Sequence, residues 1–369
     1  MKNLEKARRD AGDGAPDTLS VFDLCCPISP CSESNRNMEH TYTPVSRADI
    51  EQLWTTVAAG VSQPKNGIFG PASISWRINR ESALFLGAGR ASLLQLAHPW
   101  VAAALDRHSN LRTDPLARFH NTFKVVFTTI FGTLQQALAA SRSLYALHTR
   151  IQGAIPSSVG AFPRGSHYQA NEVDALRWVY ATLVESAMIA YESVLPPLSA
   201  IDKETYYGES KTLAMLFGIP LSALPADWAA FESYNREMWA SKTLAVSPLS
   251  REMAHRVLHG RGSWVPAPHW YRAVTGAWMP DRLREEFALP YGDWERRAAA
   301  RAIRWLPHMY RRIPTSLRHV GPYHEACARL QNRGVGPLTR ASNRFWMGGS
   351  KMLFQNQDEV GSPRVTPSA

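Results

Sequence analysis

The stretch that decides the fold runs from Gly89 to Gly153 and reads GRASLLQLAHPWVAAALDRHSNLRTDPLARFHNTFKVVFTTIFGTLQQALAASRSLYALHTRIQG. Long apolar runs with a helical period fill it, and four of the twelve histidines lie among them. Polar side chains inside apolar helices need partners, because an unpaired buried polar group costs about 1–3 kcal/mol. Either a cofactor or substrate pocket or a hydrogen-bonded core supplies such partners. The pattern therefore predicts buried helices and leaves both interpretations of the histidines open.

The composition is that of a globular protein with a substantial core. Of the 369 residues, 45% are apolar and 20% are charged, and 12 are tryptophan. A membrane-spanning helix needs about 20 consecutive apolar residues, and no uncharged run of that length occurs. The N-terminal sequence MKNLEKARRDAGDGAPD is charged, and the apolar segment of a secretory signal does not follow it. We therefore expect a soluble, cytoplasmic protein.

The formal net charge of +10 comes from 41 Lys and Arg against 31 Asp and Glu. The arginines are scattered except for a late cluster between Arg296 and Arg318, and no zinc-finger spacing or RNA-binding signature accompanies them. We therefore expect no nucleic-acid partner. The cluster is interpreted either as a solvated helical surface or as a peripheral membrane contact that gives access to a lipid-soluble substrate. The sequence specifies no oligomeric state.

Residues 45–335 are predicted to form one all-α, multi-helix domain without a significant sheet. Proline and glycine breaks divide the helical periods, and no alternating β-branched run is long enough for a sheet. Residues 1–44 are polar, so a disordered tail is expected there, and residues 336–369 are expected to be a largely disordered extension. Helices are expected, among other places, at 133–152, 171–195 (capped by Asn171), 292–305 and 315–331, with a loop at 153–170.

Two glycines early in the fold-deciding region, Gly87 and Gly89, together with Ala91, present small side chains on a buried helix. They would permit the close approach of a neighbouring helix or of a flat ligand. The same stretch, GAGRAS, lacks the preceding strand and the third glycine of a dinucleotide-binding loop. We therefore expect no dinucleotide site here.

Histidine in apolar helices is the chemical signal that remains, because HExxH and GxSxG motifs are absent. Histidine is the usual ligand of haem iron. A buried arginine such as Arg118 needs an acidic partner, and a haem propionate or a bound oxygen species would serve as one. From the residues alone, however, a histidine on an apolar stripe is more often a hydrogen-bonded core residue than a ligand.

A set of motifs in a fixed order resembles one family. The motifs are SWRINRESALFLGAGRASLLQLAHPWVAAALDRHSNLRTDPLARFHNTF, FGT, LHTRIQG, YQA, WVYATL and YYGESKTLAMLFGIP, followed by the arginine-rich LPHMYRRIPTSLR. They lie within residues 66–330 and resemble the oxygenases of the MpaB and rubber oxygenase (latex clearing protein) family. The resemblance implies helices packed around an internal b-type haem, in the manner of a globin. It also implies an oxidoreductase that uses O2 on an apolar unsaturated, isoprenoid-like substrate.

The family's motifs imply roles for individual residues. The axial histidine falls on His148, the first residue of His-Thr-Arg-Ile-Gln-Gly, which would ligate the haem iron. The family's distal Arg-x-x-Lys-Thr falls on Arg118, Asn121 and Thr122, so these three are the candidate catalytic residues, and Arg118 is also a candidate haem contact. Asn121 replaces the lysine that can cap the iron in the rubber oxygenases. This departure argues against latex cleavage itself and leaves a haem site in place.

Two further residues are candidate cofactor contacts. Tyr180 stands where the family commonly has the histidine of Trp-Val-His, and His98 precedes Pro99 at a helix start. His98 is interpreted either as a pocket residue or as a structural residue bonded to the backbone. Two other functions therefore stand beside the oxygenase. One is a non-catalytic haem sensor or carrier, and the other is a helical binding protein for a hydrophobic ligand.

Overall fold

The computed structural model describes residues 44–109, 115–259 and 267–352. Helices make up most of these residues, and a single two-stranded sheet is found among them. The all-α class expected from the sequence is therefore confirmed. Within these three ranges, no helix combines the length and the apolar character needed to cross a bilayer. The N-terminal tail expected at 1–44 lies outside the described residues, apart from its last residue.

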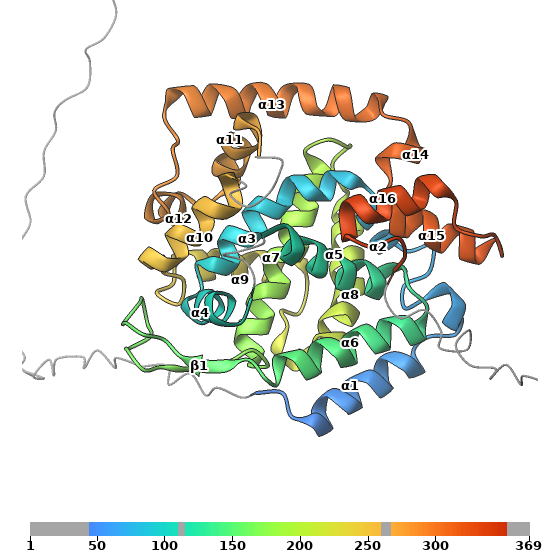
Figure 1. Cartoon of the computed structure of the whole chain (residues 1–369), viewed down its shortest axis with the longest axis horizontal. Coiled ribbons are helices and arrows are strands. Elements are labelled where there is room, and N and C mark those ends of the chain that lie inside the picture. The colour runs from blue at the N-terminus through green and yellow to red at the C-terminus, as the bar shows by residue number, and fades with distance from the viewer. Residues whose placement is uncertain (1–43, 110–114, 260–266, 353–369) are drawn as a thin grey trace, which may run out of the picture. The chain divides into compact units, whose positions relative to one another are not determined.

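Short connections join most of the successive elements (Figure 1). In chain order they are α1 (Arg47–Ala59), η1 (Pro64–Asn66), α2 (Ile74–Asn79), η2 (Ser82–Gly87), α3 (Ala88–Leu96), α4 (Pro99–His108), α5 (Pro115–Phe131), α6 (Leu134–His148), β1 (Gln152–Ala154), β2 (His167–Gln169), α7 (Val173–Glu192), α8 (Ala200–Leu216), η4 (Leu221–Ala223), α9 (Trp228–Ala240), α10 (Pro248–His259), α11 (His269–Trp278), α12 (Asp281–Glu286), α13 (Asp293–Arg312), α14 (Thr315–Arg318), α15 (Gly321–Leu330) and α16 (Pro337–Met347).

The long helix α7 lies in the interior of the helical unit (Figure 1). Side chains such as Trp178 and Val184 are buried around most of its circumference, and it packs against η2, α2, α3 and α8. A helix that is buried all round needs apolar residues on every face. The sequence of α7 provides them, so this helix is the core element from which the site is built.

Glycine allows α3 and its preceding turn to approach two neighbouring helices closely. A Cβ atom on Gly87 would lie 2.5 Å from the carbonyl oxygen of Ser186 in α7. A Cβ atom on Gly89 would lie 2.8 Å from the hydroxyl of Thr275 in α11. The sequence left open whether these small residues face a helix or a flat ligand. In the structure both glycines permit close helix packing.

The sheet forms within the segment that was expected to be a loop. Strands β1 and β2 pair antiparallel, with Gly153 opposite Tyr168. Both strands contact α4, and the Nε2 atom of His108 at the end of α4 lies 3.2 Å from the carbonyl oxygen of Gln152. The helix expected at 133–152 ends earlier, at His148.

The N-cap of α7 lies one residue later than predicted. The carboxylate of Glu172, and not the side chain of Asn171, accepts hydrogen bonds from the N–H groups of Asp174 and Ala175. A carboxylate has two acceptor oxygens, so it can satisfy two of the free N–H groups at a helix start and also interact favourably with the helix dipole. Asn171 has a different role, since its main-chain carbonyl oxygen accepts a hydrogen bond from the N–H of Val45.

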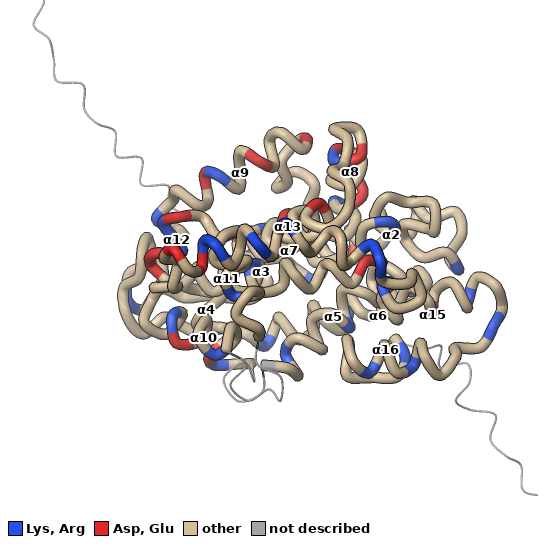
Figure 2. Tube along the Cα trace, turned by 90° about the horizontal axis from the view of Figure 1, so that it is seen from above, with Lys and Arg blue, Asp and Glu red and all other residues tan. Residues whose placement is uncertain are grey.

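The helix α13 lies along one side of the unit and packs against α11 (Figure 1, Figure 2). The sequence predicted its end at residue 305, but the helix continues through Pro307 to Arg312. Proline removes one backbone hydrogen bond. Leu306 and Tyr310 are buried on either side of it, so their packing offsets that loss. The helix expected at 315–331 is divided into α14 and α15, because Pro322 starts a new helix.

The segment 336–352 contains the helix α16 (Pro337–Met347), although a largely disordered extension was expected from residue 336 onward. The ring of Trp346 stacks on Phe85 with 3.6 Å between centroids. The amide of Asn343 donates to the buried carboxylate of Glu325 at 2.7 Å. These contacts supply the apolar burial and polar pairing that the polar composition of the segment did not indicate. Residues 353–369 lie outside the described residues.

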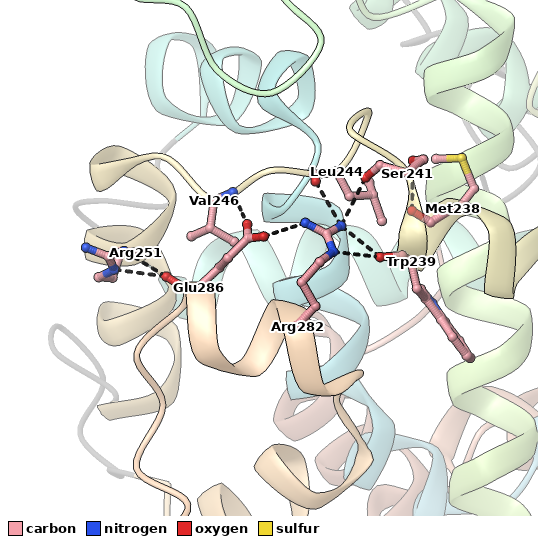
Figure 3. Close-up of polar contacts among 8 residues, drawn as sticks. All are labelled: Met238, Trp239, Ser241, Leu244, Val246, Arg251, Arg282 and Glu286. Atoms are coloured by element: carbon pink, nitrogen blue, oxygen red, sulfur yellow. Dashed lines mark hydrogen bonds and ion pairs between the residues drawn. The ribbon is translucent and has the colours of Figure 1, made fainter.

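A network centred on Arg282 fixes the loop between α9 and α10 (Figure 3). The guanidinium of Arg282 donates to the carbonyl oxygens of Trp239, Ser241 and Leu244 and pairs with the carboxylate of Glu286. The same carboxylate accepts from the N–H of Val246 at 3.0 Å. In the same loop, the N–H of Ala245 donates to the carbonyl oxygen of Ala97, just before α4. The network therefore supports the start of α4.

Candidate functional site

A cavity of about 380 Å³ lies between α4, α5, α6 and α7, with the β2 strand at one side. Its volume falls in the range of small-molecule binding sites, about 300–1,000 Å³. Apolar side chains form most of its wall, including Val125, Leu147, Val179 and Phe217. The polar side chains that line it are Gln95, His108, Ser109, Arg118, Asn121, Thr122, His148, Tyr168 and Gln169.

His148 is the last residue of α6 and lines the cavity. The helix begins with a capping box between Thr133 and Gln136, which fixes where α6 starts and therefore where it ends. Burial, with a smaller contribution from the charge of Arg118, lowers the pKa of His148 to about 4. The imidazole is therefore neutral at pH 7, and neutral imidazole is the form that binds a metal ion.

Arg118 lies on α5 and lines the same cavity. Its Nη1 atom donates to the hydroxyl of Thr122 at 3.1 Å, and that hydroxyl donates to the carbonyl oxygen of Arg118 at 2.9 Å. Burial lowers the pKa of the guanidinium below its usual range. Among the residues that the structure describes, no carboxylate forms an ion pair with Arg118. Its positive charge is therefore available to an anionic group in the cavity.

Asn121 completes the polar face of α5. Residues three and four apart share one side of a helix, and Arg118, Asn121 and Thr122 all line the cavity. Asn121 is more exposed than its two neighbours. Where the resemblance expects a lysine charge, the cavity therefore has an uncharged amide that both donates and accepts hydrogen bonds.

His98 and Tyr180 do not line the cavity, although the sequence suggested both as cofactor contacts. His98 is buried, with its ring 5.4 Å from that of Phe162. The Tyr180 hydroxyl lies 2.6 Å from that of Ser210, and burial raises the pKa of Tyr180 above its usual range. Adjacent residues on a helix point about 100° apart, so Val179 faces the cavity while Tyr180 faces the core behind it. The structure thus separates these two residues from the site.

Five polar residues of the cavity were not identified from the sequence as site residues, namely Gln95, His108, Ser109, Tyr168 and Gln169. His108, the last residue of α4, lines the cavity. Gln95 donates to the hydroxyl of Thr182 at 3.0 Å, and burial raises the pKa of Tyr168. Tyr168 belongs to the YQA motif of the family resemblance, and that motif was the one signal that could have identified it.

A smaller cavity of about 70 Å³ adjoins the first. Thr122, Val126 and Leu183 line both cavities. The walls of the smaller cavity are mainly apolar, and the phenylalanines Phe69, Phe123 and Phe127 are among them. Thr122 therefore lies at the boundary between the two spaces.

A profile of the family described as "ER-bound oxygenase mpaB/B'/Rubber oxygenase, catalytic domain" matches residues 76–312. The chain belongs to this family. The match starts within α2, ends with α13 and includes Arg118, Thr122 and His148. No curated protein and no solved structure matched the chain. The matched range is shorter at both ends than the range of motif resemblance, 66–330. Membership of this family supports an oxidoreductase of the oxygenase type.

Proposed function

We propose that this oxygenase-family protein is haem-dependent and uses O2 on an apolar unsaturated, isoprenoid-like substrate. The observation that carries the proposal is the neutral imidazole of His148 in an apolar cavity that also contains the unneutralised charge of Arg118. Neither feature alone would be specific. Together they match what a haem needs, a neutral nitrogen ligand for the iron and a cation for a propionate, within apolar walls.

The residues of the cavity fit a b-type haem. His148 would ligate the iron, and Arg118 would pair with a carboxylate of the cofactor or with negative charge that develops on oxygen. When bound, the haem would supply the redox chemistry with molecular oxygen. The apolar wall formed by residues such as Val125, Val179 and Phe217 would bind an apolar substrate and exclude water.

The protein's own contribution would be to hold the charged group of Arg118 in place and to offer selected hydrogen bonds inside an apolar cavity. The hydroxyl of Thr122 is held by its two hydrogen bonds with Arg118, so it keeps the guanidinium in one position. The side chain of Asn121 would offer a neutral amide to substrate or oxygen in place of the lysine of the rubber oxygenases. This difference supports a substrate other than latex rubber.

Absorption spectroscopy of purified protein from haem-replete cells tests the proposal. We expect a Soret band in the wild type that shifts on reduction with dithionite. His148→Ala should abolish the band, whereas His120→Ala should retain it, because His120 lies outside the cavity with its Nε2 atom 3.0 Å from the carbonyl oxygen of Phe345. Colourless wild-type protein that takes up no added hemin would exclude haem dependence.

A second candidate function is non-catalytic binding of haem or of a hydrophobic ligand. The uncharged Asn121 is the observation that favours it, since the cavity lacks the lysine found in the rubber oxygenases. Oxygen uptake by haem-loaded protein with prenyl compounds separates the two functions. Uptake that depends on Arg118 supports the oxygenase, and haem binding without any uptake supports a sensor or carrier. Lipid extracted from colourless protein would support a hydrophobic-ligand binding protein.

A further inference from the structure

The outer face of α13 is a continuous basic stripe. Its inner face is formed by small and apolar residues that pack on the unit, namely Ala299, Ala302, Leu306 and Tyr310. The opposite positions, which alternate three and four residues apart and are all exposed, are Arg297, Arg301, Arg304, His308 and Arg311. Residues with this spacing share one side of a helix. The stripe therefore lies on the side of α13 opposite the buried residues.

The positive charge of the stripe is not balanced by acidic residues on the same part of the helix. From Arg297 to Arg312 the helix contains five arginines and neither Asp nor Glu. In the part of the chain that the structure describes, none of these five forms an ion pair. Two arginines of the cluster noted in the sequence differ, because Arg296 pairs with Asp293 and Arg318 pairs with the buried Glu81. Arg296 and Arg318 are therefore paired within the protein, whereas the arginines of the stripe can contact a partner.

Large apolar side chains are exposed beside the stripe. Trp294 is 54% exposed and Met309 is 52% exposed, and Trp305 lies between them on the same flank of α13. Just beyond the helix, Leu317 is 59% exposed. Exposed apolar side chains that gather on one surface and are bordered by polar residues are typical of protein or membrane contact sites. Their position next to arginines gives α13 an apolar flank and a cationic face.

We propose that α13 is a membrane-contact helix that lies in the headgroup region of an anionic phospholipid bilayer. Arginines would contact the lipid phosphates, and the tryptophan, methionine and leucine side chains would reach the acyl boundary. Tryptophan suits this depth because it combines an apolar ring with a polar N–H. A nucleic acid would satisfy the arginines but would leave Met309 and Leu317 without a role. The lipid surface therefore accounts for both features, and this inference does not depend on haem.

Co-sedimentation of the full chain with vesicles tests this inference. We expect binding to vesicles of phosphatidylcholine containing phosphatidylserine, with little binding to phosphatidylcholine alone. Binding should weaken steeply as salt is raised, because salt screens the attraction of the arginines to the lipid. A variant with Arg297→Glu, Arg301→Glu and Arg304→Glu should bind at least about tenfold more weakly.

Two matched variants show whether the helix itself is responsible. Replacing Arg164, Arg236 and Arg333 by Glu changes the net charge equally at exposed positions elsewhere, and this control should bind like the wild type. Replacing Trp294 and Met309 by Ser keeps the arginines, and it should bind several-fold more weakly than the wild type at equal salt. Circular dichroism and haem absorption should be unchanged in all variants, which keeps this test separate from that of the proposed function.

Three outcomes would overturn the inference. Wild-type protein that does not bind anionic vesicles at low salt has no such contact. Equal loss of binding in the α13 variant and in the control variant would mean that overall charge, and not this helix, determines binding. Binding to nucleic acid that depends on the α13 arginines, without vesicle binding, would assign the helix to a different partner.

Discussion

Replacing His148 by glutamine should remove a measurable part of the acid sensitivity of the haem-free protein. Burial, assisted by the charge of Arg118, lowers the pKa of His148 to about 4 in the folded state. In the unfolded chain an imidazole titrates near pH 6.5. Between these two values the unfolded state binds a proton more readily than the folded state. The free energy of unfolding therefore decreases as the pH falls through this window.

The size of the effect follows from the same two values. Well above pH 6.5, His148 is neutral in both states and its protonation has no effect on stability. As the pH falls to about 4, the protein loses stability by about 1.36 kcal/mol for each pH unit, or about 3 kcal/mol in all. Glutamine keeps a polar side chain in the cavity but does not titrate. The variant should therefore escape this part of the loss.

Urea unfolding of the haem-free proteins at about pH 7 and about pH 4, followed by circular dichroism, measures the difference. We expect the wild type to lose about 2–3 kcal/mol more than His148→Gln between these pH values. His120→Gln serves as the matched control, because His120 lies outside the cavity. Equal losses in the wild type and His148→Gln would refute the reasoning.

Three further substitutions test other parts of the structure. Arg118→Met should raise the pKa of His148 above about 4 but keep it below 6.5, because burial is the larger cause, and NMR titration of the imidazole checks this. Arg282→Ala removes the hydrogen-bond donor of three backbone carbonyls and the ion-pair partner of Glu286. Urea unfolding should show a free energy of unfolding that is lower by about 2 kcal/mol. A change below about 0.5 kcal/mol would contradict the network in Figure 3. Gly87→Ala should lower the free energy of unfolding by about 1–3 kcal/mol, because the new Cβ atom would lie 2.5 Å from a carbonyl oxygen of α7. Gly208→Ala in α8, where no atom would lie within 4 Å of the new Cβ, is the control and should be neutral or stabilising in the same urea unfolding experiment.

The helical class could be predicted because it depends on local patterns, whereas the candidate site residues came from the resemblance to the family. Apolar periodicity identifies the helices, and the family motifs fall on Arg118 and His148, which the fold brings to one cavity. The sequence suggests Tyr180 as a cofactor contact only from its position in a motif, and it leaves His98 open between a pocket residue and a structural residue. Such an assignment does not include the direction of the side chain. A rotation of about 100° per residue places Tyr180 against Ser210 and away from the cavity.

Contacts between distant parts of the chain account for what the sequence could not predict. The order of α16 depends on Phe85, which is far from it in sequence, and on Glu325 in the preceding helix. The extension of α13 past Pro307 depends on Tyr310, whose hydroxyl donates to the buried Glu81. A polar segment or an internal proline looks like a break until its partner is known. The sequence alone does not name that partner.

The packing of α16 means that the family domain and the folding unit do not share a boundary. The family match ends at Arg312, yet α15 and α16 pack against α5, the helix that carries Arg118. A chain shortened to the matched residues would expose the face of Phe85 and remove a support of one cavity wall. In this protein the residues beyond the family match therefore belong to the frame that holds the cavity.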